Sequence, residues 1–176
     1  MNLAASPAPD ASAVLDQQAQ AQHNQNEARQ LTKYVSFMLA GERYALGAAK
    51  INEVLRPTDI TPVPGAPEFI LGIINLRGNV VTVVDARTMF GLEVQPPTQQ
   101  SRIVVVEIED FIAGVLVDQV AAVIDLDASC IDVAPDTGDQ AAARFIRGVY
   151  NMEAEDGESA LYVLVDFDRM TELLPH

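Results

Sequence analysis

Residues 67–87, PEFILGIINLRGNVVTVVDAR, decide the fold of this chain of 176 residues. Two apolar runs, 69–74 and 80–84, flank a short polar turn, Asn-Leu-Arg-Gly-Asn at 75–79. Apolar runs joined by a short turn containing glycine predict a β-hairpin. The turn carries Arg77, a permanent charge that a turn against a core rarely needs. Arg77 is therefore the first residue for which the sequence suggests a role beyond folding.

The composition limits the classes of partner. Hydrophobic residues make up 49% of the chain, enough for a substantial core. Its 11 basic and 25 acidic residues leave a net charge of −14, which repels nucleic acid and anionic membranes. The single cysteine, Cys130, forms no internal disulfide, and we expect it to be half-buried and unreactive. No apolar run reaches the roughly 18 residues of a membrane span. We expect a cytoplasmic protein with no direct membrane insertion.

The chain divides into a tail and a folded region. Residues 1–32 have few large apolar side chains, which predicts a flexible tail, and residues 33–176 form the domain. Segment 48–55 places Ile51, Val54 and Leu55 at a spacing that fits a short helix, but it could equally continue as a strand, and the pattern leaves both open. Around it we predict a hairpin over 34–46, a proline-rich loop over 57–67, a helical turn over 86–91, a connector over 93–100 and a final helix over 168–174.

The second half repeats the plan of the first. Residues 145–151, FIRGVYN, echo residues 69–75, FILGIIN, at an offset of 76, and residues 162–166 echo the end of the second apolar run. A repeat this long indicates a duplicated small domain. The prediction is a mainly β fold: two five-stranded antiparallel β-barrels of SH3 or OB type with short helices, packed together. The approximate lobes are 33–95 and 100–176, with strands free to cross between them.

Some strands are apolar on both faces. Val81 and Val83 lie on one face of the second run, and Val80 and Val84 lie on the other. A barrel interior uses only one of these faces. We expect the second face to pack against the sister barrel or a protein partner.

The reactive side chains are few. His23 lies in the tail and His176 is the last residue, so neither is placed for metal binding or proton transfer. The sequence has no phosphate-binding glycine loop and no nucleophile elbow. The prediction is no catalytic residue, no cofactor and no metal. A hydrolase with paired carboxylates between the barrels is one competing hypothesis. A barrel for single-stranded nucleic acid is another, which the acidic charge disfavours.

Two pairs of charged residues have alternative explanations. Asp85 and Asp166 follow apolar strands at equivalent places, where an aspartate most simply caps the next helical turn, a structural role. Glu53 and Arg77 interrupt apolar segments, and an ion pair between them would hold the turn in place. In the alternative, Arg77 is presented to a partner. The two roles of Arg77 are compatible.

The motif Phe69-Ile70-x-Gly72-x-x-Asn75-Leu76-Arg77-Gly78, followed by Val84-Asp85-x-Arg87, closely resembles the bacterial chemotaxis coupling protein family CheW. Segments 51–54 and 114–120 extend the resemblance, which runs from about Tyr34 to the C-terminus. The family's fold, two packed five-stranded barrels, agrees with the duplication. The resemblance implies an adaptor without catalytic activity, which links a chemotaxis histidine kinase to membrane chemoreceptors. The equivalent adaptor of a type IV pilus or other chemosensory-like system is the alternative.

The resemblance also assigns partners and residues. It implies contacts with the kinase regulatory domain, the cytoplasmic tip of chemoreceptors and further CheW-like chains in rings, with recruitment to receptor arrays at the membrane. Val120 and Val123 match an apolar groove wall between the lobes, where a receptor helix would dock. The implied protein-binding residues are Ile51, Glu53, Val54, Gly72, Asn75, Leu76, Arg77, Gly78, Val120 and Val123.

Overall fold

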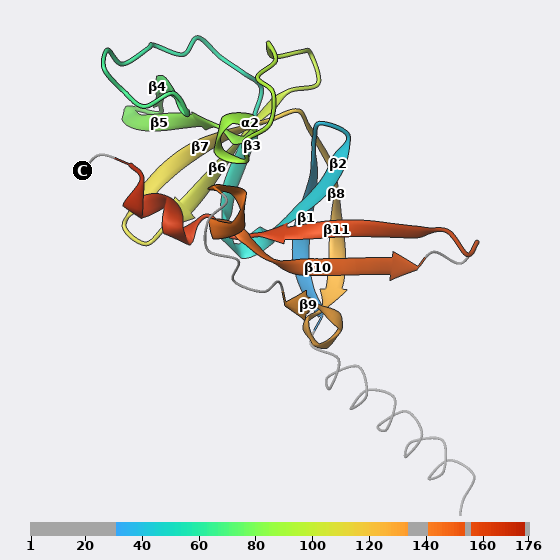
Figure 1. Cartoon of the computed structure of the whole chain (residues 1–176). Helices are drawn as coiled ribbons and strands as arrows, with labels where there is room; N and C mark the ends of the chain where they lie inside the picture. The colour runs from blue at the N-terminus through green and yellow to red at the C-terminus, as the bar shows by residue number, and fades with distance from the viewer. Residues whose placement is uncertain (1–30, 134–140, 154–155, 175–176) are drawn as a thin grey trace, which may run out of the picture.

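The computed structural model describes residues 31–133, 141–153 and 156–174 (Figure 1). Most of the predicted tail, together with His23 and His176, lies outside the described residues. The strands are β1 (Leu31–Leu39), β2 (Glu42–Gly47), β3 (Ile51–Leu55), β4 (Ile70–Leu76), β5 (Asn79–Asp85), β6 (Arg102–Ile108), β7 (Phe111–Val117), β8 (Gln119–Asp127), β9 (Asp132–Val133), β10 (Ile146–Glu153) and β11 (Ser159–Val165). The helical segments are η1 (Ala48–Lys50), α2 (Ala86–Met89), η2 (Ala128–Cys130), η3 (Ala141–Arg144) and η4 (Asp168–Glu172).

These strands form two sheets. Sheet A has the order β8-β1-β2-β11-β10-β9, and sheet B has the order β3-β6-β7-β5-β4. In Figure 1 the strands of sheet B lie toward the left and those of sheet A toward the right. The two sheets confirm the mainly β prediction. Sheet A has six strands because the two-residue β9 joins it, and each sheet has one parallel pair, β2 with β11 and β5 with β7, where the prediction had only antiparallel pairs.

The two sheets have the same topology. β1, β2, β8, β10 and β11 of sheet A occupy the places of β6, β7, β3, β4 and β5 of sheet B. The duplicated sequence therefore gives a duplicated sheet. The first two strands of each half are exchanged: β1 and β2 lie in one sheet with β8, β10 and β11, and β6 and β7 lie in the other with β3, β4 and β5. Each sheet thus combines segments from both halves of the sequence.

Three apolar clusters explain why strands are apolar on both faces. Val81 and Val83 lie in a cluster within sheet B, while Val84 belongs to a larger cluster that joins both sheets. A third cluster, around Leu126 and Leu164, lies within sheet A. The larger one, called here the interlobe core, confirms the predicted packing of the sister units. Val80 is 69% exposed, so the sister unit does not cover it, and for Val80 the predicted contact with a protein partner stays a prediction.

Aromatic rings fill the centre of the interlobe core. Phe90, just after α2, lies 5.3 Å from Tyr44 of sheet A, 5.9 Å from Phe145 and 6.4 Å from Phe167, measured between ring centroids. Such tilted and edge-on arrangements suit the quadrupoles of aromatic rings. One ring from the side of sheet B thereby packs among three from the side of sheet A.

Several shorter segments and Cys130 were also predicted from the sequence. The ambiguous segment 48–55 begins with the short 3₁₀ helix η1 and continues as the strand β3. Leu31 and Thr32, predicted in the tail, are the first residues of β1. The predicted final helix over 168–174 is a 3₁₀ helix, η4, and Met170 and Leu174 pack in the interlobe core. Cys130 is exposed, so the expectation of a half-buried side chain is wrong.

Candidate functional site

Arg77 lies at the tip of the β4–β5 hairpin in a left-handed backbone conformation. Its φ is 53° and that of Gly78 is 86°, the pattern of a two-residue hairpin turn with both central residues at positive φ. The side chain of Asn75 accepts a hydrogen bond of 3.0 Å from the N–H of Gly78. The turn Ala40-Gly41, with φ of 50° and 80°, has the same pattern without a charge. The turn geometry therefore does not require an arginine.

Arg77 reaches back to the edge strand of sheet B. One guanidinium nitrogen lies 3.3 Å from Oε2 of Glu53 on β3, which confirms the ion pair predicted from the sequence. The Arg77 side chain is nevertheless 80% exposed, while that of Glu53 is 25% exposed. An exposed ion pair contributes about 0–1 kcal/mol to stability. Arg77 is thus both paired and presented to solvent.

A hollow of about 360 Å³ lies beside this pair. Glu53 and Arg77 contribute charged groups to its lining, and Leu76, Val105 and Ile112 contribute apolar ones. Asn52 and Asn79 complete the lining, and none of Asn52, Asn79, Val105 and Ile112 was singled out from the sequence. A depression lined by both charged and apolar side chains suits an inserted side chain of a protein partner.

The other predicted residues on sheet B have different surroundings. Val54 is 40% exposed on β3, whereas Ile51 is half-buried against the interlobe core. Gly72 is buried, with φ of 150°, and a Cβ built on it would lie 2.1 Å from the carbonyl oxygen of Thr61. Gly72 therefore holds the preceding loop against β4. It does not contact the hollow beside Arg77.

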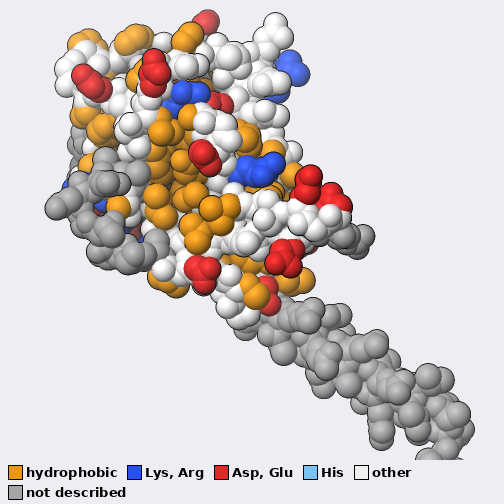
Figure 2. Space-filling model, turned by 45° about the vertical axis from the view of Figure 1, so that its right-hand side comes forward, with side chains coloured by type: hydrophobic (Ala, Val, Ile, Leu, Met, Phe, Trp, Pro, Cys, Tyr) orange, Lys and Arg blue, Asp and Glu red, His pale blue; other side chains and the backbone are white. Residues whose placement is uncertain are grey.

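Val120 and Val123 lie on sheet A, on the edge strand β8. Val120 is half-buried against the interlobe core, and Val123 is 62% exposed. Figure 2 shows hydrophobic side chains gathered in a band on one face of the molecule, with single acidic and basic side chains around it. By the strands that carry them, the predicted residues form two groups on different sheets. One group lies on sheet B around the Arg77 turn, and the other lies on β8 of sheet A.

The two aspartates lie at equivalent positions in the two units. Asp85 is the N-cap residue of α2, and its side chain accepts from the N–H of Arg87 at 3.3 Å and the hydroxyl of Thr88 at 2.9 Å. Asp166 accepts from the N–H of Asp168 at 2.8 Å and pairs with Arg147. Both carboxylates bind backbone N–H groups at the start of a helical turn.

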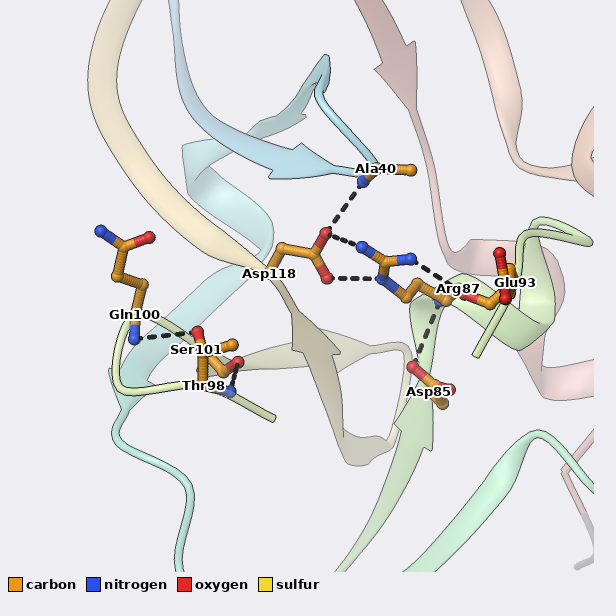
Figure 3. Close-up of polar contacts among 8 residues, drawn as sticks. All are labelled: Ala40, Asp85, Arg87, Glu93, Thr98, Gln100, Ser101 and Asp118. Atoms are coloured by element: carbon orange, nitrogen blue, oxygen red, sulfur yellow. Dashed lines mark hydrogen bonds and ion pairs between the residues drawn. The ribbon is translucent and has the colours of Figure 1, made fainter. Parts of the chain in front are cut away.

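A second ion pair, between Arg87 and Asp118, was not identified as a functional site from the sequence. The guanidinium of Arg87 donates to both carboxylate oxygens of Asp118, at 2.8 and 2.6 Å (Figure 3). The Arg87 side chain is 12% exposed, and its hydrogen bond with Asp118 raises its pKa. Burial alone would raise the pKa of Asp118, but hydrogen bonds from Arg87 and from the N–H of Ala40 outweigh burial and lower it. The only sequence signal for this pair was a charged residue beside each of two apolar strands.

Within the described residues, no group of three His, Cys, Asp or Glu side chains is arranged to hold a metal ion. In the same part of the chain, no helix is long and apolar enough to cross a membrane.

Two packed sheets of the same topology, with exchanged strands, define a two-lobed β domain. The family model of the CheW-like domain matches residues 33–173, and the chain belongs to this family. The family resemblance drawn from the central motif is thereby confirmed.

Individual relatives agree with this assignment. The chain is 32% identical over 120 residues to Chemotaxis protein CheW of Helicobacter pylori, covering 68% of this chain and 73% of that protein. It is 29% identical over 129 residues to Protein PilI of Pseudomonas aeruginosa, covering 73% and 72%. The crystal structure of scaffolding protein TtCheW from Thermoanaerobacter tengcongensis superposes with a TM-score of 0.71 at 34% identity, covering 81% of this chain and 93% of that one.

Proposed function

We propose that this protein is a non-catalytic adaptor that couples chemoreceptors to a chemotaxis histidine kinase. The observation that carries the proposal is the match to the CheW-like domain over residues 33–173. The adaptor is cytoplasmic and joins receptor arrays at the membrane through its partners. It works by holding two proteins in a fixed arrangement, so its functional groups are contact residues.

The Arg77 turn is the proposed centre of the coupling surface on sheet B. A non-glycine residue in the left-handed region costs roughly 1 kcal/mol, and an exposed ion pair returns at most about as much. Stability therefore does not account for the arginine. An exposed guanidinium beside a hollow of mixed polar and apolar lining suits a partner with an acidic or carbonyl-bearing edge around an apolar side chain. In this proposal Asn75 and Gly78 shape the turn, Gly72 supports its strand, and Glu53, Val54 and Leu76 complete the contact area.

The β8 strand is the proposed second contact. Val123 is exposed and Val120 adjoins the interlobe core, and Ile51 also packs against that core from β3. Apolar residues at the edge of a core suit the docking of a receptor helix by its apolar face. The kinase regulatory domain and further CheW-like chains would then use other faces of the two lobes.

The experiment reconstitutes receptor, kinase and this protein, and measures the receptor-dependent rate of kinase autophosphorylation. Arg77→Ala and Glu53→Ala should each lower receptor control by about tenfold, the effect of losing about 1.4 kcal/mol of contact free energy. Arg147→Ala is the matched control, because Arg147 forms an exposed ion pair with Asp166 within sheet A, away from the Arg77 turn and from β8. Unchanged receptor control in both variants would contradict the proposed site. Absence of kinase binding by the unaltered protein would contradict the proposed function.

A second candidate is the equivalent adaptor role in a type IV pilus or other chemosensory-like system. The similarity to Protein PilI of Pseudomonas aeruginosa supports this second candidate. Affinity purification of the tagged protein from its own cells, followed by identification of the bound kinase by mass spectrometry, separates the two. A kinase encoded with pilus proteins would support the second candidate, and one encoded with flagellar proteins would support the first.

A further inference from the structure

Asp118 is the residue at which the chain passes from one sheet to the other. β7 of sheet B ends at Val117, and β8 of sheet A begins at Gln119. The backbone N–H of Asp118 donates to the carbonyl of Met38 on β1 at 3.1 Å. The crossover is therefore attached to sheet A as soon as the chain leaves sheet B.

The Asp118 carboxylate contacts elements of both lobes (Figure 3). One oxygen accepts a hydrogen bond of 2.9 Å from the N–H of Ala40, in the β1–β2 turn of sheet A. Both oxygens accept from Arg87 in α2, the helix that follows β5 of sheet B. A further nitrogen of Arg87 donates to the carbonyl of Glu93 at 2.9 Å. The carboxylate thus links the helix of one lobe to a turn of the other.

This pair differs in burial from the other ion pairs among the described residues. Arg87 is 12% exposed, whereas the basic side chains of the others are at least half exposed. A bidentate arginine–carboxylate pair fixes direction as well as distance, and burial reduces its screening by solvent and salt. The apolar contacts of the interlobe core are non-directional and tolerate small displacements. Among the side chains described, Arg87 gives the least exposed directional contact between the lobes, through the Asp118 carboxylate that also binds Ala40.

The other crossover carries a counterpart with the charges reversed. Lys50 lies in η1 between β2 of sheet A and β3 of sheet B, and its Nζ lies 3.3 Å from a carboxylate oxygen of Asp168. Asp168 begins η4, which follows β11 as α2 follows β5. Both side chains are well exposed, 50% and 39%, so this pair contributes little.

We infer that Arg87 is a positioning residue, which acts through Asp118 to fix the orientation of the two lobes relative to each other. Each lobe also has its own apolar cluster. Loss of the pair therefore leaves both sheets folded and lets one move against the other. Where the proposed adaptor function applies, this orientation sets the distance between the Arg77 turn on sheet B and the β8 surface on sheet A.

The test measures the distance between the lobes by pulsed electron paramagnetic resonance. In a Cys130→Ser background, spin labels are placed at Ala121→Cys on β8 and Glu107→Cys on β6, both exposed positions on strands of different sheets. We expect Arg87→Met to broaden or shift the distance distribution. Arg147→Met is the matched control, because it removes an arginine–aspartate pair at 2.9 Å between the β10–β11 ends of one sheet, and it should leave the distribution unchanged.

Two further variants cover the case in which Arg87→Met does not fold, which far-UV circular dichroism would reveal. Arg87→Lys keeps the charge and loses the bidentate geometry, and Asp118→Asn keeps an acceptor for Ala40 and loses the ion pair. Both should broaden the distribution, Arg87→Lys less than Arg87→Met. A distribution identical to that of the unaltered protein in every folded variant would overturn the inference.

A functional measurement tests the role of Arg87 independently of the proposed adaptor function, on which the effect of lobe orientation on coupling rests. In the reconstituted system, Arg87→Met should retain kinase binding and lose receptor control of the kinase. If the unaltered protein binds no kinase, the proposed function is contradicted, and the distance measurement still decides the role of Arg87.

Discussion

Asp118 shows how one residue combines an electrostatic and a topological role. Its carboxylate is partly buried, and burial acts against the charged form. Hydrogen bonds from Arg87 and Ala40 favour the charged form more strongly, so the pKa of Asp118 lies below its ordinary value. A group with a lowered pKa binds fewer protons in the folded state than in the unfolded state. Its contribution to stability is therefore present above the unfolded pKa of about 4 and is lost as the pH falls through the folded pKa.

This sign gives a prediction for Asp118→Asn. The variant should be less stable than the unaltered protein at pH 7, and the difference should narrow as the pH falls below about 4, because protonation then removes the same charge. Urea unfolding followed by circular dichroism at several pH values measures it. In an Arg87→Met background, Asp118→Asn should have little further effect. A difference in stability that stays constant with pH would contradict the assignment.

At the scale of single elements, the β4–β5 and β10–β11 hairpins share a structural feature, a register shift beside a glycine. Both contain a register shift, beside Gly72 in one and Gly148 in the other. At each glycine a neighbouring backbone approaches closely: Thr61 pairs with Ile73, and β9 pairs with Gly148. A side chain at either glycine would collide with a carbonyl oxygen, at 2.1 Å from Thr61 and 2.5 Å from Asp132. The glycines of the repeated motif are therefore explained by packing.

Gly72→Ala tests this explanation. The added Cβ must displace the backbone of Thr61, and the φ of 150° is unfavourable for alanine. We expect a loss of about 3 kcal/mol in the free energy of unfolding. Gly47→Ala is the control, since no atom lies within 4 Å of its added Cβ and its φ is −53°. Urea unfolding gives both values, and equal stability of the two variants would contradict the explanation.

At the scale of the whole molecule, the interlobe core and the exchanged strands make the two lobes one unit. β3 and β8 each leave the half of the sequence that precedes them and pair with the other half. The Phe90 ring then packs against three rings from the other lobe. We expect the lobes to unfold together, because neither sheet is complete without strands from both halves.

Phe90→Ala should therefore destabilise the whole molecule. Truncation of a buried phenylalanine costs about 3–5 kcal/mol. Circular dichroism and hydrogen exchange should report one common transition, with amides of both sheets losing protection together. Leu161→Ala, at a side chain that is 56% exposed, is the control and should change stability by less than about 0.5 kcal/mol. Separate unfolding transitions for the two sheets in the Phe90 variant would contradict the expectation that the two lobes unfold together.

Much of this protein was determined by its sequence alone. The run containing Val81, Val83 and Val84 predicted a strand with two apolar faces. Successive side chains point to opposite faces of a strand, whichever strand it pairs with. The repeat of 69–75 at 145–151 predicted duplicated units, and Glu53 and Arg77 were predicted to pair, as they do. These features depend on local pattern and on turn chemistry, which are written in consecutive residues.

The tertiary structure alone decided how these strands combine. The exchange of strands between the two halves, the parallel pairs and the contact of Arg87 with Asp118 join residues far apart in the chain. An apolar strand pattern is compatible with many partners, so it does not specify the neighbour. For the same reason Val80 and Val84, alike in the sequence, differ in burial, since a second sheet covers only one of them. Pairing and coverage depend on the packing of the whole chain, which no single stretch contains.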